Sequence, residues 1–157
     1  MQGTVYVESS VVSYLRSRIS RDLVLAARQQ ETRDWWEDDR RRYEVYASEI
    51  VVREISRGDR EAAAERLEAL RDVPNLDLNE ESYSLAEVLL DSGAIPKEYP
   101  EDALHIAVAT VHGIDYLLTW NFRHINNAAH RSAIEHAVRA HGFECPVICT
   151  PEELTEG

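Results

Sequence analysis

The stretch PEDALHIAVATVHGIDYLLTWN, residues Pro100–Asn121, joins the pattern of a buried helix to that of a buried strand. From Ala103 to Val111 almost every residue is apolar or small, which predicts a helix packed on most of its circumference. The run DYLLT that follows predicts a short buried strand ending near Asn121. The helix nevertheless opens with Glu101 and Asp102. Polar groups therefore collect where the helix begins and where the strand ends.

Outward from this stretch, short β-rich runs alternate with helical patterns along the whole chain. This order predicts an α/β fold, a three-layer α/β/α sandwich around a mainly parallel sheet. The predicted strands are Thr4–Glu8, Tyr43–Ala47, Leu76–Leu78, Asp115–Thr119 and Pro146–Cys149. Besides the helix that opens with Glu101 and Asp102, helices are predicted after Ser9, from about Arg21 to Asp39, after Ser48, after Gly58, from Asn79 to about Asp91, and near Arg131 to His141, before the last strand.

Helical spacing also predicts which side chains face the core, and serines are expected to cap two of the helices. For the helix from Arg21 to Asp39 the expected inner residues are Leu23, Val24, Ala27 and Trp35, and for the helix after Gly58 they are Ala62, Leu67 and Leu70. Ser9 or Ser10 is expected to cap the first helix, and Ser48 stands in the same position after the second strand.

Composition limits the possible partners. The 157 residues fit one domain, spanning 1–157, and the formal net charge of -12 would repel RNA unless cations or a local basic patch intervene. Neither a signal-peptide pattern nor an apolar run of membrane-spanning length occurs, so we expect a cytoplasmic protein that does not contact a membrane. Cys145 and Cys149 are interpreted as small buried hydrophobes, in preference to a disulfide or a metal knuckle.

Four oxygen-bearing side chains share one place in the predicted topology. Glu8 ends the first strand, Asn121 follows the fourth, and Glu54 and Asp102 lie on helices that reach the same edge. Ligands of open parallel sheets bind at the carboxyl ends of the strands. Clustered carboxylates raise one another's pKa unless a cation relieves them, and Mg²⁺ or Mn²⁺ favours such oxygen ligands. The sequence therefore predicts a divalent-metal site that could recruit a phosphodiester and activate water.

Each of these residues also has a purely structural interpretation. Asp102 could complement the helix macrodipole, and Asn121 could serve as a turn residue. Glu8 could be solvated, and Glu54 could pair with a neighbouring arginine. No single one of these four residues indicates a metal site, but their shared position at one edge of the sheet does.

Two segments resemble PIN-domain ribonucleases, specifically VapC-type toxins of toxin-antitoxin systems. EDALHIAVATVHGIDYLLTWN is similar to the family's Asp-Ala-x-x-Ala helix and Leu-Leu-Thr-x-Asn strand end, and SEIVVREISRG places Ser48, Glu54 and Gly58 as in its Ser-x5-Glu-x3-Gly segment. The resemblance assigns Glu54, Asp102 and Asn121 to an acidic site, with Thr119 as a nearby hydroxyl. Glu8 stands where the family usually has Asp.

The resemblance implies an endoribonuclease that uses Mg²⁺ or Mn²⁺ and leaves a 5′-phosphate and a 3′-hydroxyl. It also implies a homodimer and a cognate antitoxin protein. Two alternatives stay open: a phosphate-accepting α/β domain, which lacks the aspartate it would need at a strand end, and a non-catalytic PIN-like protein that acts through protein or RNA binding, which the Glu8 departure favours.

Two histidines and two tryptophans near these segments have competing interpretations. His105, one turn after Asp102, could orient a carboxylate or a water molecule at the metal, or could be a partly buried histidine bonded to backbone. His124 could contact a substrate phosphate. Trp35 and Trp36 could stack on bases, but adjacent tryptophans on a helix more commonly serve core and dimer contacts.

Overall fold

A computed structural model describes residues 3–156; Met1, Gln2 and Gly157, the ends of the predicted domain, lie outside the described residues. Its centre is a five-stranded sheet in the order β3-β2-β1-β4-β5, and every pairing between neighbouring strands is parallel. The strands are β1 Thr4–Val7, β2 Glu44–Ser48, β3 Asn75–Leu76, β4 Tyr116–Leu118 and β5 Val147–Cys149. The predicted α/β class with a parallel sheet is confirmed.

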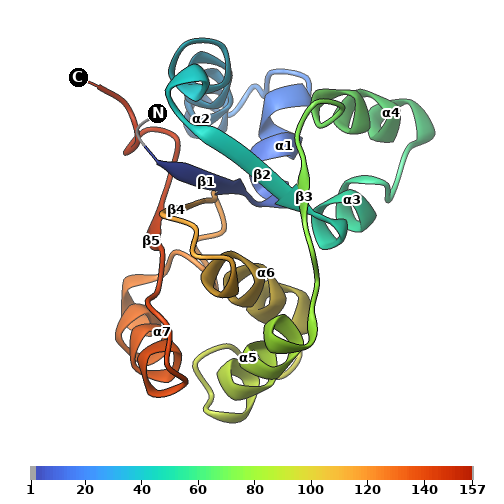
Figure 1. Cartoon of the computed structure of the whole chain (residues 1–157). Coiled ribbons are helices and arrows are strands. Elements are labelled where there is room, and N and C mark those ends of the chain that lie inside the picture. Colours follow the sequence, from blue (N-terminus) through green and yellow to red (C-terminus); the bar gives the residue numbers. More distant parts are fainter. Residues whose placement is uncertain (1–2, 157) are drawn as a thin grey trace.

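Within residues 3–156, seven α-helices complete the three layers. They are α1 Ser9–Arg16, α2 Leu23–Asp34, α3 Glu49–Ile55, α4 Arg60–Ala69, α5 Glu80–Asp91, α6 Pro100–Val111 and α7 Ala128–Ala140. A π-helical turn, Trp35–Asp39, and a 3₁₀ turn, Arg40–Arg42, continue α2 toward β2. Helices α1, α2 and α4 lie on one side of the sheet, and α5, α6 and α7 lie on the other (Figure 1).

The core lies between the sheet and these two helical layers. The side chains of β1 from Val5 to Val7 are all buried, as expected for a central parallel strand covered on both faces. Every residue of α6 from Ala103 to Thr110 is also buried, so the predicted packing of this helix on most of its circumference is confirmed. Gly113, at φ +70°, then allows the tight reversal that leads from α6 into β4.

The inner faces of α2 and α4 differ from the prediction. Leu23 and Val24 are 85% and 58% exposed, and Ala27 is also exposed, whereas α2 buries Gln29 and Thr32. Hydrogen bonds explain why Gln29 is buried. It binds the α1–α2 loop, donating to Ser17 Oγ and accepting from the backbone N–H of Ser20. On α4 the buried residues are Ala63 and Ala69, followed by Leu70 just after the helix, while Ala62 is half-buried and Leu67 is exposed.

The tryptophan pair is divided between core and surface. Trp35 is fully buried and donates its indole N–H to the Leu154 carbonyl at 3.0 Å, so its predicted core position is confirmed. Trp36 is half-buried and has the Arg40 guanidinium over its ring at 4.2 Å.

Cys149 is buried, as expected, whereas Cys145 is half-buried. Both are free, and burial raises the pKa of Cys145 to about 11 and that of Cys149 to about 12. Within residues 3–156, no helix combines the length and the apolar character needed to cross a membrane.

Of the predicted serine caps, only the position of Ser48 is confirmed, and the cap predicted for the first helix is wrong. Helix α1 begins at Ser9 itself, and the residue in the N-cap position is Glu8, which makes no side-chain capping bond. Ser48 does occupy the N-cap position of α3, again without a capping bond. Strand β1 ends at Val7, one residue before the predicted end, although the Glu8 N–H still bonds the Leu118 carbonyl of β4 at 3.0 Å. The hydroxyls of these serines are used instead by the side chains that gather at the carboxyl edge of the sheet.

Candidate active site

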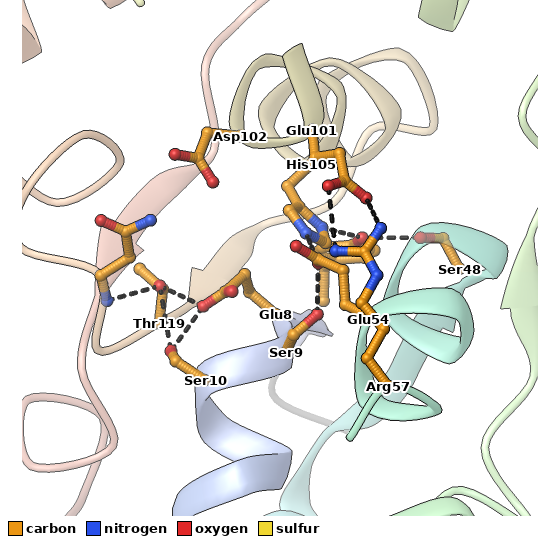
Figure 2. Close-up of polar contacts among 12 residues, drawn as sticks. Glu8, Ser9, Ser10, Ser48, Glu54, Arg57, Glu101, Asp102, His105 and Thr119 are labelled. Atoms are coloured by element: carbon orange, nitrogen blue, oxygen red, sulfur yellow. Dashed lines mark hydrogen bonds and ion pairs between the residues drawn. The ribbon is translucent and has the colours of Figure 1, made fainter. Parts of the chain in front are cut away.

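Three ionisable side chains from separate elements converge at the carboxyl edge. Glu8 follows the central strand β1, Glu54 lies on α3 after β2, and His105 lies on α6 (Figure 2). One potential ligand atom from each lies within 4.8 Å of the others. The strand order brings them together, because β1 pairs with both β2 and β4 and the chain leaves all three strands at the same edge.

Glu8 is held by two hydroxyls. The residue is only 5% exposed, and its Oε1 accepts from Ser10 Oγ at 2.5 Å and from Thr119 Oγ1 at 2.6 Å. Ser10 lies on the first turn of α1 and Thr119 directly follows β4, so residues of two separate segments hold the same carboxylate oxygen. Hydrogen bonds that favour the charged form offset part of the cost of burying it.

Glu54 is held through a buried chain of side chains. Its Oε1 accepts from Ser9 Oγ at 2.6 Å and contacts His105 Nε2 at 2.5 Å. His105 is fully buried, and its Nδ1 lies 2.7 Å from the Tyr6 hydroxyl, which in turn lies 2.7 Å from Ser48 Oγ. Both ring nitrogens thus contact side chains, and His105 connects the Glu54 carboxylate to the sheet.

The charges around these hydrogen-bonded side chains favour an ion pair between Glu54 and His105. Burial alone would lower the pKa of His105, but the bond to Glu54 and the charges of Glu8, Glu54 and Asp102 raise it above 6.5. Burial would raise the pKa of Glu54, but its bond and charge interaction with His105, helped by Ser9 and Arg57, lower it below 4.5. Burial also raises the pKa of Tyr6 well above 10.0, so this hydroxyl stays protonated. A protonated His105 is a hydrogen-bond donor and leaves metal ligation to the carboxylates.

Asp102 stands slightly apart from this group. It lies in the first turn of α6, and its Oδ2 is 2.8 Å from His124 Nδ1. In Figure 2 its carboxylate is not joined to Glu8, Glu54 or His105 by any interaction, yet its charge contributes to the raised pKa of His105. His124 is itself 6% exposed, and its ring centroid is 3.9 Å from that of Tyr99.

Asn121 is placed near the group but its side chain shapes a turn. Its Oδ1 accepts the backbone N–H groups of Arg123 at 3.1 Å and His124 at 3.0 Å. Its own N–H donates to Thr119 Oγ1 at 2.9 Å, so Thr119 links this turn to Glu8. The turn role considered for this residue is therefore present, and its role toward a metal stays a prediction.

Glu101, the residue before Asp102, forms an ion pair outside the carboxylate group. Glu101 forms an ion pair with Arg57 at 3.0 Å, which ties the start of α6 to the end of α3 across an exposed surface. Glu54 was considered as a partner for Arg53 or Arg57; its hydrogen bonds go to Ser9 and His105 instead.

Sequence reasoning missed the supporting residues Tyr6, Ser9 and Ser10. The two serines directly follow Glu8, and their hydroxyls bond Glu54 and Glu8 instead of capping the helix as predicted. Tyr6 is two residues before Glu8 on a strand, so its side chain points to the same side of the sheet as that of Glu8. That periodicity was the available signal for including Tyr6.

Carboxylates held at the carboxyl edge of a parallel sheet define a candidate metal site on an α/β/α fold. The PIN domain family matches residues 5–130, and the chain belongs to this family. PIN domains are generally nucleases that use divalent metals, and the buried acidic cluster fits such a site. Neither the curated proteins nor the solved structures include a match to this chain.

Proposed function

We propose that this protein is an endoribonuclease dependent on Mg²⁺ or Mn²⁺, with Glu8, Glu54, Asp102 and Asn121 as its site residues. The observation that carries the proposal is the arrangement of Glu8 and Glu54, two carboxylates from different elements held next to each other in a largely buried position. Two carboxylates this close destabilise the folded state unless a cation binds them, because like charges at short distance oppose folding. His105 offsets part of that cost.

The donor atoms fit a hard divalent cation. The hydrogen bonds to Glu8 and to Glu54 go to Oε1 in both cases, and none among residues 3–156 goes to either Oε2. Each carboxylate thus keeps one oxygen for a ligand, in the manner that Mg²⁺ and Mn²⁺ favour. Glu8 and Glu54 would hold the cation, with Asp102 and Asn121 completing the set. When bound, a cation here activates water and neutralises charge on the phosphodiester.

The residues of the chain have separate tasks in this proposal. Ser9, Ser10 and Thr119 hold the Oε1 atoms and so direct the remaining carboxylate oxygens. His105 positions Glu54, and His124 positions Asp102. The rigid backing of each carboxylate keeps its geometry when substrate binds.

We further propose that the protein is a VapC-type toxin that acts in the cytoplasm on RNA. Support comes from the Ser48, Glu54 and Gly58 spacing and from the motif that runs from Asp102 to Asn121. This role would bring a homodimer and a small antitoxin encoded next to the gene. The second candidate, a non-catalytic PIN-like protein, is favoured only by Glu8 in place of the usual Asp. A DNA-binding antitoxin reading frame beside the gene would separate the two.

Purified protein should cleave RNA when a divalent metal is present. In incubations with a panel of tRNAs and rRNA, we expect fragments with 5′-phosphate and 3′-hydroxyl ends in Mg²⁺ or Mn²⁺ and none in EDTA. Glu54→Gln should give no fragments, because the amide removes the charge at nearly constant shape. Intact RNA under every metal condition would favour the binding protein over the nuclease.

Metal should also stabilise the fold, since a cation that binds only the folded state raises its melting temperature. We expect Mn²⁺ to raise the Tm of the wild type and to raise that of Asp102→Asn by less. Glu101→Gln is the matched control, because Glu101 is the adjacent acid on α6 but pairs with Arg57. If Asp102→Asn and wild type respond equally in a thermal melt, Asp102 is not part of the metal site.

A further inference from the structure

Two pairs of an arginine and an aromatic ring flank the turn that follows β4. The Arg28 guanidinium lies 4.9 Å from the ring centroid of Phe122 and 5.6 Å from that of Trp120. The Arg123 guanidinium lies 5.7 Å from the ring centroid of Tyr99. Phe122 and Arg123 are consecutive and directly follow Asn121, so both pairs border the candidate active site.

The first pair is anchored to the site through Trp120. This side chain is 5% exposed, and its indole N–H donates to Thr32 Oγ1 at 2.8 Å. Its backbone N–H donates to Ser10 Oγ, the hydroxyl that also binds Glu8. Phe122, two residues later, is 41% exposed. An exposed ring is therefore held at a defined position relative to the Glu8 carboxylate.

The second pair leads to Asp102. The Tyr99 ring packs on His124, and His124 contacts the Asp102 carboxylate at 2.8 Å. Tyr99 is half-buried and Arg123 is exposed. A continuous row of side chains thus runs from a solvent-exposed guanidinium to a carboxylate of the site.

Neither of these arginines forms an ion pair among residues 3–156, although the charge of Arg28 acts on the carboxyl of Glu31. Among residues 3–156, Arg16, Arg42 and Arg57 form ion pairs, whereas Arg28 and Arg123 form none. In a chain of net charge -12, unpaired cations beside an acidic site supply the local attraction that a polyanion requires.

We propose that this surface, formed by Arg28, Tyr99, Phe122 and Arg123, binds single-stranded RNA. Bases stack on Phe122 and Tyr99, phosphates contact the two arginines, and the strand passes over the carboxylates between them. Aromatic rings combined with cations are the means by which proteins bind single strands without reading their sequence. The inference rests on the proposed nuclease function, for which it names the residues of this chain that would hold the substrate.

A third pair provides a matched control. Arg40 lies over Trp36, which is also half-buried, but this pair precedes β2 and so lies toward the amino edge of the sheet. The same chemistry is thus present on the side away from the carboxylates. If only the position beside the site matters, Trp36→Leu should leave RNA binding unchanged.

The test is the affinity for a labelled single-stranded RNA, measured by fluorescence anisotropy in EDTA so that no cleavage occurs. Phe122→Leu keeps an apolar side chain but removes the ring, and we expect roughly tenfold weaker binding. Phe122→Trp should bind at least as well as wild type. Arg123→Gln should reduce the slope of log affinity against log salt by roughly one. Duplex RNA of the same sequence should bind more weakly, since its bases are not free to stack.

Equal affinity of wild type and Phe122→Leu would overturn the proposal and leave the surface to a protein partner. Equal losses in Phe122→Leu and Trp36→Leu would overturn it as well. Failure of the nuclease proposal looks different: the wild type would bind RNA through Phe122 and yet cleave none with any metal. Thermal melts of each variant establish that the changes in binding do not come from unfolding.

Discussion

Glu8→Gln should abolish metal-dependent RNA cleavage while leaving the fold intact. The amide can still accept from Ser10 and Thr119, which bond Oε1 of Glu8, so the local structure has little reason to change. The charge that would hold the cation is lost. We expect the single-turnover rate at fixed Mn²⁺ to fall by at least roughly 100-fold, the upper range for loss of a residue that only supports a metal ligand.

Glu8→Asp is the informative companion, because it restores the residue that the family usually has. Its arm is shorter by roughly 1.5 Å, one carbon–carbon bond. In this chain Ser10 and Thr119 are placed for the longer Glu8 side chain, so we expect reduced but clear activity. Equal single-turnover rates for wild type and Glu8→Gln would exclude Glu8 from catalysis.

His105→Phe should weaken the apparent affinity for Mn²⁺ by roughly 10- to 100-fold, as loss of a residue that orients a metal ligand does. The substitution nearly keeps the ring volume but removes both nitrogens, which leaves Glu54 held only by Ser9. His105→Gln retains a donor near Nε2 and should lose less. The measurement is a metal titration of the melting temperature, which does not depend on cleavage. An unchanged Mn²⁺ affinity in His105→Phe would contradict a positioning role.

The Glu54 and His105 pair also predicts how stability depends on pH. The pKa of His105 is raised above 6.5, so its contribution is complete below pH 6.5 and is lost as the pH rises through the folded-state pKa. The pKa of Glu54 is lowered below 4.5, so its contribution is complete above pH 4.5 and is lost as the pH falls through the folded-state pKa. The free energy of unfolding should therefore benefit most between pH 4.5 and 6.5.

His105→Phe provides the control for this profile. Urea unfolding of the wild type should show lower stability at about pH 9 than at about pH 6, and the variant should show a smaller difference. A decline of the same size in both proteins would assign the pH dependence to other groups.

Much of the fold and the residue types of the site could be predicted from local patterns. Almost every residue from Ala103 to Val111 is apolar or small, and the structure buries every residue from Ala103 to Thr110. Parallel strands followed by helices have one carboxyl edge, so residues that end strands must meet there. That is why Glu8 and Glu54 could be expected near each other before any contact was known.

Amphipathic patterns were less reliable at the molecular surface. In α2 the apolar residues Leu23 and Val24 face solvent, whereas Gln29 is buried because it satisfies the backbone of the preceding loop. Hydrophobic periodicity predicts which apolar residues face the core, but it contains no information about hydrogen bonds to another segment of the chain.

The sequence by itself determined the parallel α/β architecture, the family and the presence of carboxylates at one edge, because these follow from periodicity and from short motifs. Only the tertiary structure decided how each carboxylate is held. Whether Thr119 reaches Glu8, and whether His105 faces backbone or Glu54, depends on side chains more than 40 residues apart in sequence. Such contacts exist only after the layers have packed, since hydrogen bonding in a buried site follows the geometry that packing imposes.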